Sequence, residues 1–286
     1  MKRLIYPIVI LSLLMFACTV STTPISSPQA PVPLTETQLV VTNTPPTPPT
    51  ETQLVVTNTP PGPQANVICN ELSFYLDPAL ATGYTCTTVP ARPSGINPQP
   101  QYTEVTLTGY VLTDRSQSPQ IDVFPTQGYL DIYPDGIKGF QSDLQSLIDG
   151  GVPGDSLPFL NPYESAQLFH AQYEVLNVAS SSSGIRYLTQ YAQNFVPIND
   201  HDMFYTYQGM TSDTTYMITI ILPVSNPMLP ESSDNIPGGQ TWEQFSNNFT
   251  AYLTDLKTQV NGLDPKAFTP TLSMLDTLAA SIAIQP

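Results

Sequence analysis

Apolar and polar side chains alternate along several stretches of the chain, which predicts β-strands. Between residues 103 and 112, Val105 and Leu107 face one side, while Glu104 and Thr106 face the other. A period of two is typical of a strand with one buried face. Residues 216–222 are apolar on both faces, so we expect this strand to lie centrally in a sheet. Further strands are predicted at residues 72–76, 120–124, 169–175, 185–191 and 203–209.

Other stretches repeat their apolar positions at helical spacing. These stretches are residues 137–148, 241–262 and 269–282, and a short helix is expected at 126–133. The second helix begins at a capping box, in which the Thr241 hydroxyl and the Gln244 amide satisfy free N–H groups reciprocally. Runs of strands and runs of helices indicate an α+β fold. We therefore predict one globular domain at residues 67–286, with an antiparallel sheet of about six to seven strands covered by three or four helices.

Four segments of this domain, taken in order, resemble the PsbP-type α+β sandwich. They are residues 72–78, 185–188, 205–222 and 281–284. This chain carries longer loops than a small member of that family. The resemblance implies a binding or assembly factor, and it supplies no catalytic residue.

The first eighteen residues have the pattern of a secretory signal. Lys2 and Arg3 precede an apolar run, residues 4–17, that is shorter than the roughly 20 residues of a membrane-spanning helix. The run ends at Ala17-Cys18. A cysteine directly after a small residue resembles a bacterial lipoprotein signal, although Met15 stands where such signals usually carry Leu. The alternative is an ordinary secretory signal in which Cys18 is incidental.

The lipoprotein resemblance implies a signal peptide at residues 1–17, cleavage before Cys18, and attachment of acyl chains such as palmitate at that cysteine. More than one acyl chain anchors a protein firmly to a membrane. We therefore expect an extracytoplasmic protein held at a cell membrane or cell surface by Cys18.

Residues 18–66 read as a tether. Of the 48 residues from 19 to 66, 11 are Pro and 12 are Thr, and none is aromatic. Residues 35–46 recur without change at 50–61. A short, proline-rich repeat cannot bury a core, so we expect a disordered, extended linker. The chain as a whole resembles bacterial surface lipoproteins with Thr/Pro tethers.

The chain is strongly acidic. Without Lys2 and Arg3 it has 6 basic and 23 acidic residues, a net charge of −17. Nucleic acids and anionic lipids require a basic surface, so we expect neither as a partner. Calcium or a basic partner is compatible with this charge, but we favour a solvated acidic surface over a specific cation site. We expect no cofactor and no metal.

Two cysteines, Cys69 and Cys86, remain after Cys18. In an oxidising compartment such a pair predicts a disulfide. Their spacing does not suit zinc, which needs three or four ligands close together.

The sequence carries none of the common catalytic or phosphate-binding motifs. His201 lies between Asp200 and Asp202, which could form a cation or polar site, although a polar loop between strands has the same composition. His170 alternates with Phe169 and Ala171, so we expect it on the polar face of its strand, exposed to solvent or hydrogen-bonded. The same alternation places Tyr173 and Val175 on the face of Phe169 and Ala171.

Tyrosines recur on the predicted strands. Tyr187, Tyr191, Tyr205 and Tyr207 could form an aromatic surface for a protein or a glycan, or they could pack within the sheet. The sequence thus favours a non-catalytic binding or assembly module. The alternative is an extracytoplasmic hydrolase that uses His201 or His170 with nearby carboxylates.

Overall fold

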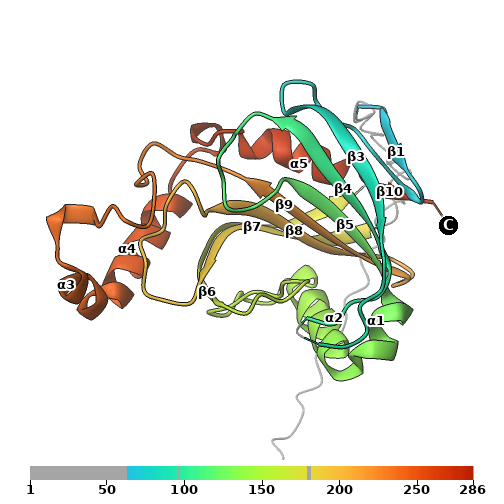
Figure 1. The fold of residues 1–286 in the computed structure, drawn as a ribbon, viewed down its shortest axis with the longest axis horizontal. Helices are drawn as coiled ribbons and strands as arrows, with labels where there is room; N and C mark the ends of the chain where they lie inside the picture. The colour runs from blue at the N-terminus through green and yellow to red at the C-terminus, as the bar shows by residue number, and fades with distance from the viewer. Residues whose placement is uncertain (1–62, 96, 179–181, 286) are drawn as a thin grey trace, which may run out of the picture. The chain divides into compact units, whose positions relative to one another are not determined.

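A seven-stranded antiparallel sheet forms the central layer of the domain (Figure 1). The computed structural model describes residues 63–95, 97–178 and 182–285. The expected signal at 1–17, Cys18 and the tether as far as residue 62 lie outside the described residues. In spatial order the strands are β3 (Ala81–Val89), β4 (Tyr102–Tyr110), β5 (Gln120–Pro125), β9 (Tyr216–Pro223), β8 (Phe204–Thr211), β7 (Ser182–Ala192) and β6 (Ala166–Val178). With the helices packed on this sheet, the predicted α+β class is confirmed, and β9 is central as expected.

One face of the large sheet carries the main hydrophobic core. Tyr205 on β8 and Ile220 on β9 point into it and pack in the same cluster as Leu275 on α5 (Leu272–Ala280). Figure 1 shows α5 above this face, with α3 (Trp242–Asn247) and α4 (Phe249–Asn261) beyond the β6 side. The apolar stripe predicted for the last helix is therefore buried against the sheet.

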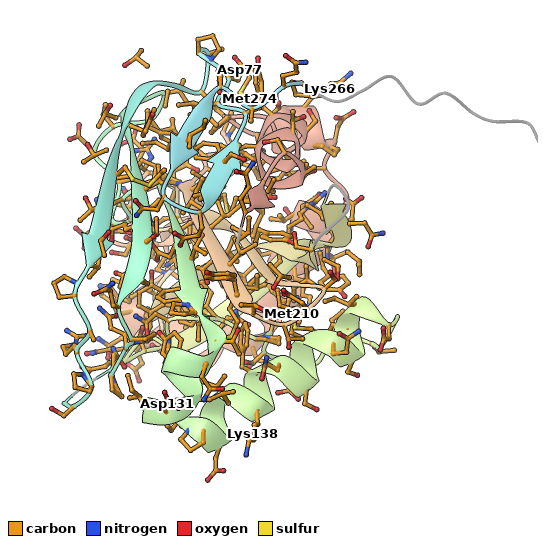
Figure 2. The ribbon with its side chains drawn as sticks, turned by 90° about the vertical axis from the view of Figure 1, so that its right-hand side faces the viewer. Asp77, Asp131, Lys138, Met210, Lys266 and Met274 are labelled. Carbon is orange, nitrogen blue, oxygen red and sulfur yellow. A yellow bond between two sulfur atoms is a disulfide. The ribbon has the colours of Figure 1, made fainter. Side chains whose placement is uncertain are left out.

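The opposite face is covered by α1 (Thr126–Ile132), α2 (Pro134–Ile148) and the segment 157–163. Leu144 on α2 packs with Met210 on β8. Figure 2 shows Met210 beside α2, whereas Met274 lies at the opposite end of the domain, on α5. The large sheet is thus a middle layer with apolar packing on both faces.

A second, three-stranded sheet pairs two strands from the N-terminal part of the domain with one strand from its C-terminal part. It consists of β1 (Val67–Cys69), β2 (Leu72–Phe74) and β10 (Ala283–Ile284), with β2 in the middle. The predicted disulfide is confirmed: Cys69 on β1 is bonded to Cys86 on β3, with 5.7 Å between their Cα atoms. The bond therefore links the small sheet to the outermost strand of the large one.

Two of the longer elements differ from the sequence prediction, and the short strands β1 and β10 were not predicted either. Strand β3 was missed because residues 82–88 have no buried side chain on either face, so no apolar alternation marks them. The helix expected over 241–262 is divided at Asn248, whose φ of −106° and ψ of 7° separate α3 from α4. Of the described helices, none has both the length and the apolar character needed to cross a membrane.

A β-bulge in β6 divides the apolar side chains of this strand between the two faces of the sheet, contrary to the sequence prediction. The pairing of β6 with β7 shifts between Ala171 and Glu174, and Gln172 between them has a φ of 53°. Phe169 and Ala171 therefore point into the main core, while Tyr173 and Val175 pack on the opposite face. Simple alternation had placed all four apolar side chains together.

Candidate functional site

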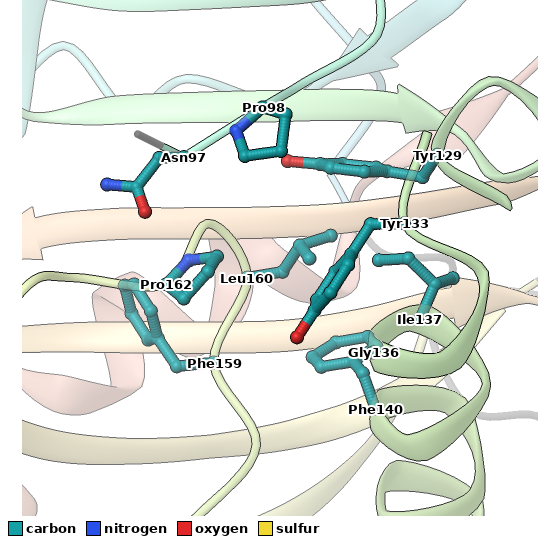
Figure 3. Close-up of a pocket in the computed structure, with 10 residues that line it drawn as sticks. All are labelled: Asn97, Pro98, Tyr129, Tyr133, Gly136, Ile137, Phe140, Phe159, Leu160 and Pro162. Atoms are coloured by element: carbon teal, nitrogen blue, oxygen red, sulfur yellow. The ribbon is translucent and has the colours of Figure 1, made fainter. Parts of the chain in front are cut away.

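An apolar cleft of about 370 Å³ opens where α1 and α2 meet the segment 157–162. Figure 3 shows helix residues on one side of the cleft, Phe159 and Pro162 on the other, and Asn97 and Pro98 above. The lining residues share aromatic or apolar side chains with a few neutral polar groups: Asn97, Pro98, Tyr129, Tyr133, Gly136, Ile137, Phe140, Phe159, Leu160 and Pro162. None of them carries a charge. Ligand pockets typically have this character, namely apolar walls with a few polar groups.

The break between α1 and α2 places Tyr133 in the cleft. Tyr133 has a φ of −141° and a ψ of 63°, which ends α1, and Pro134 then begins α2 with a preset φ. Its ring lies over the first turn of α2, against Gly136, where any Cβ atom would clash with the ring. The Tyr133 side chain remains 53% exposed, so it is available to a ligand.

Hydrogen bonds fix the opposite wall of the cleft to the sheet. The backbone N–H of Leu160 donates to Gln208 Oε1 at 2.9 Å, and the Thr219 hydroxyl donates to the Leu160 carbonyl at 2.7 Å. The Tyr129 hydroxyl donates to Asn161 Oδ1 at 3.0 Å. Because these partners are buried, the wall that carries Phe159 and Pro162 is held in place before any ligand binds.

A pair of carboxyl groups lies behind the cleft. Glu104 on β4 and Asp122 on β5 are direct cross-strand partners. The pKa of Asp122 is raised to about 7: burial raises it most, a hydrogen bond from Gln120 partly offsets this, and the charge of Glu104 adds to the rise. The rings of Tyr102, Phe124 and Tyr129 connect this pair to the cleft through centroid distances of 4.5 and 5.2 Å. The pair does not line the cleft itself.

The loop that holds Asp200, His201 and Asp202 satisfies its own polar groups. His201 Nδ1 lies 2.8 Å from Asp202 Oδ1, and Asn199 donates to the other oxygen of Asp202 at 2.9 Å. Asp200 accepts the backbone N–H of Asn226 at 2.8 Å. Within the described part of the chain, no group of three His, Cys, Asp or Glu side chains is placed to hold a metal ion. The geometry of this loop is that of a polar connection between strands.

His170 is buried and hydrogen-bonded rather than exposed. Its Nε2 lies 2.9 Å from the Gly154 carbonyl and 3.0 Å from Lys257 Nζ. Burial and the positive charge of Lys257 lower its pKa, although the Gly154 carbonyl and Asp155 oppose this shift. His170 lines a cleft beside α4 that also contains Thr254. The Thr254 hydroxyl donates to the backbone of its own helix, so it is not activated by the histidine.

The four tyrosines proposed as an aromatic surface lie mostly inside the domain. Tyr187, Tyr205 and Tyr207 are fully buried, which matches the packing alternative. Tyr205 donates to Asp276 at 3.0 Å, and Tyr187 donates to the Pro158 carbonyl at 2.8 Å. Tyr191 is half-buried and packs against Phe159 and Tyr163 behind the cleft.

Sequence reasoning missed the aromatic residues that do line a cleft. Tyr129 lies on the short helix α1, Tyr133 lies in the break between α1 and α2, and Phe159 lies in a loop. The available signals were the Tyr133-Pro134 helix break and the Pro158-Phe-Leu-Asn-Pro162 segment, in which prolines bracket an aromatic residue.

Known proteins give no further guide to the site, because no family model, no curated protein and no solved structure matches this chain. The similarity to the PsbP-type sandwich therefore stays an expectation from the sequence.

Proposed function

We propose that this protein is a non-catalytic binding module, held outside the cytoplasm by lipid on Cys18, and that its ligand occupies the aromatic cleft. The observation that carries the proposal is the cleft itself: it has a preformed apolar wall, an exposed tyrosine and no charged lining residue. Pockets of about 300–1,000 Å³ commonly hold small ligands, and the cleft, at about 370 Å³, lies within this range.

The ligand class that fits best is a neutral sugar ring of a glycan. Aromatic faces such as those of Tyr133 and Phe159 pack well against amphipathic rings. The Asn97 amide and the Tyr133 hydroxyl supply hydrogen bonds to hydroxyl groups. The absence of charge in the lining disfavours ionic ligands, since a buried charge without a partner is costly. The extracytoplasmic location proposed above would expose the cleft to glycans.

A titration with neutral oligosaccharides tests this function. Cello-, xylo-, manno- and chitopentaose would be added to the protein in a calorimeter. We expect at least one of them to bind, and Tyr133→Ala to weaken its binding by about tenfold, which corresponds to about 1.4 kcal/mol. Tyr84→Ala is the matched control, because Tyr84 is also an exposed tyrosine and lies on β3, outside the cleft. Failure of every oligosaccharide to bind, or equal binding by both variants, would refute the glycan assignment.

The lipid anchor is tested separately. Membrane-extracted protein should have the mass of a chain that starts at Cys18 plus its acyl chains, and Cys18→Ala should release the protein from the membrane. Equal membrane binding by this variant would contradict the anchor.

The rival function is an extracytoplasmic hydrolase based on His170, because this histidine lines a cleft that also holds Asp155. Removal of a general base costs roughly 10²-fold or more in rate. If a hydrolytic activity on a peptide, ester or glycan panel were found, and the combined change His170→Ala with His201→Ala abolished it without unfolding the domain, the hydrolase would replace the binding module.

A further inference from the structure

A second hollow, of about 280 Å³, follows the aromatic cleft along α2. In this polar hollow, α2 contributes Asp143, Ser146 and Leu147, and the segment 152–158 forms the other wall. The aromatic cleft takes Gly136 and Phe140 from the same helix. Positions 136, 140, 143 and 147 are three or four residues apart, so they share one face of a helix. One stripe of α2 therefore lines both hollows.

The opposite wall is continuous as well. Residues within 159–162 face the earlier part of α2 in the aromatic cleft, and residues within 152–158 face its later part in the polar hollow. Beneath both, Leu147 and Leu157 are buried in one apolar cluster, and Phe140 and Phe159 pack against it. Figure 3 shows α2 continuing past Phe140, away from Tyr133. The two hollows are thus consecutive parts of one groove.

Hydrogen bonds to β6 hold the wall of the polar hollow in place. The Gly154 carbonyl lies 2.9 Å from Nε2 of the buried His170. The backbone N–H of Leu157 donates to Gln167 Oε1 at 2.8 Å. Both partners belong to β6, so this wall is fixed to the sheet before any ligand binds, which lowers the entropy cost of binding.

The two hollows differ in their chemistry. The aromatic cleft presents rings, whereas Asp143, Ser146 and Ser156 expose one carboxylate and two hydroxyl groups in the polar hollow. A carboxylate accepts hydrogen bonds and a hydroxyl both donates and accepts them, so these groups suit the hydroxyl groups of a sugar. Of the described residues that line the two hollows, Asp143 alone is charged. Its negative charge disfavours an acidic sugar at this place.

We propose that the ligand is a linear, uncharged oligosaccharide that lies along α2, with its first sugars in the aromatic cleft and its later sugars in the polar hollow. This inference rests on the glycan function proposed above and adds the course of the ligand. From Gly136 to Leu147 the helix spans about 16 Å, at about 1.5 Å per residue, which exceeds one sugar ring. A sugar chain has apolar ring faces for Tyr133 and hydroxyl groups for Asp143, so one chain satisfies both hollows.

Calorimetric titration with two chain lengths tests the groove. The probes are the disaccharide and the pentasaccharide of the cello, xylo, manno and chito series. In the series that binds, we expect the pentasaccharide to bind at least tenfold more tightly than the disaccharide. Asp143→Ala combined with Ser156→Ala should weaken the pentasaccharide about tenfold and leave the disaccharide unchanged, because only the longer chain reaches the polar hollow. Tyr133→Ala should weaken both lengths.

The matched control is Asp255→Ala, because Asp255 is also an exposed aspartate on a helix and lies outside both hollows. It should leave both affinities unchanged. Equal affinity for the two lengths, or a double variant that weakens both lengths alike or neither of them, would overturn this inference while the glycan function stands. If no oligosaccharide of either length binds, the glycan function fails and this inference falls with it.

Discussion

Asp122 shows how a single residue in the sheet can set the pH response of the domain. It is only 4% exposed, and its cross-strand neighbours are Glu104 and Thr219. Its Oδ2 accepts a hydrogen bond from Gln120 at 2.9 Å, while Oδ1 has no hydrogen-bond partner among the described residues. A buried carboxylate with one unpartnered oxygen is costly to ionise. The side chain therefore divides between its neutral and charged forms near neutral pH.

We expect stability to fall as pH rises from about 4 to above 7. The folded pKa of Asp122, about 7, lies above the ordinary value of 3.8, so the folded state holds a proton that the unfolded state releases in this range. The variant Asp122→Asn should lose this part of the decline and, above pH 7, be more stable than the parent by at most about 4 kcal/mol. Urea unfolding at several pH values measures this.

The exposed Asp234→Asn is the control for the loss of one negative charge and should not alter the pH profile. A parent protein whose stability is constant between pH 4 and 8, after correction by that control, would contradict the raised pKa.

The sequence predicted the surroundings of some residues correctly and did not predict those of others. The Cys69–Cys86 bond followed from having two cysteines in one domain. The burial of Tyr205 and His170 did not follow, because alternation along one strand does not reveal whether both faces of the sheet are covered. Arg186 is a further case: it is buried, and it forms ion pairs with Glu174 at 2.5 Å and Asp276 at 3.2 Å, which come from different elements.

At the scale of elements, the bulge in β6 links the sheet to the end of α4. The Gln172 side chain donates to the Val260 and Leu263 carbonyls at 2.8 and 3.0 Å, and its backbone N–H donates to Asn261 at 2.6 Å. The Val260 carbonyl belongs to the last turn of α4, where carbonyl groups lack partners within the helix, and Leu263 follows the helix. The positive φ of Gln172 is the backbone cost of this arrangement.

This arrangement predicts an unusual order of stability. Gln172→Ala should lose about 2 kcal/mol, because it removes two hydrogen bonds and keeps the strained backbone. Gln172→Gly should be less destabilising than Gln172→Ala, since glycine adopts a positive φ freely. Elsewhere in a strand, glycine is the worse residue of the two.

Urea unfolding of both variants measures the order, with the exposed Gln193→Ala as a control that should change stability by less than about 0.5 kcal/mol. A glycine variant less stable than the alanine variant would show that the bulge does not strain residue 172.

Helices and strands that a short sequence pattern marks were predicted, and those without such a pattern were not. The capping box at Thr241 and Gln244 is present, with both of its hydrogen bonds. The division of that helix at Asn248 has no marker in the sequence. Strand β3 carries none either, because a strand exposed on both faces has no reason to alternate.

At the scale of the whole molecule, the candidate cleft depends on contacts between distant segments. The cleft brings together Asn97, Tyr133 and Phe159. They line it because α1 and α2 pack on one face of the sheet and the segment 157–162 is hydrogen-bonded to β8 and β9. The α+β class could be read from the order of strands and helices. The cleft could not, since no local pattern tells which loops meet.

The disulfide should contribute to the stability of the whole domain. It closes a loop between residues separated by 17 positions, for which the chain-entropy model gives about 3 kcal/mol. Replacing both cysteines by alanine should lower the free energy of unfolding by about this amount. Urea unfolding of the parent with and without reductant provides the comparison, and reductant should not affect the alanine variant. Equal stability of oxidised and reduced parent would contradict the prediction.

The same bond sets how the domain would bear mechanical force. A pull on the chain ahead of β1 acts first on the pairing of β1 with β2, and from Cys69 it passes directly to Cys86 in β3, so the chain between the two cysteines is not extended. The segment between the two cysteines could add roughly 60 Å of length, at about 3.5 Å per residue, only after the disulfide is reduced. Tension along the tether would then reach the edge of the large sheet without first separating β2 from β10 and the C-terminal end of the domain.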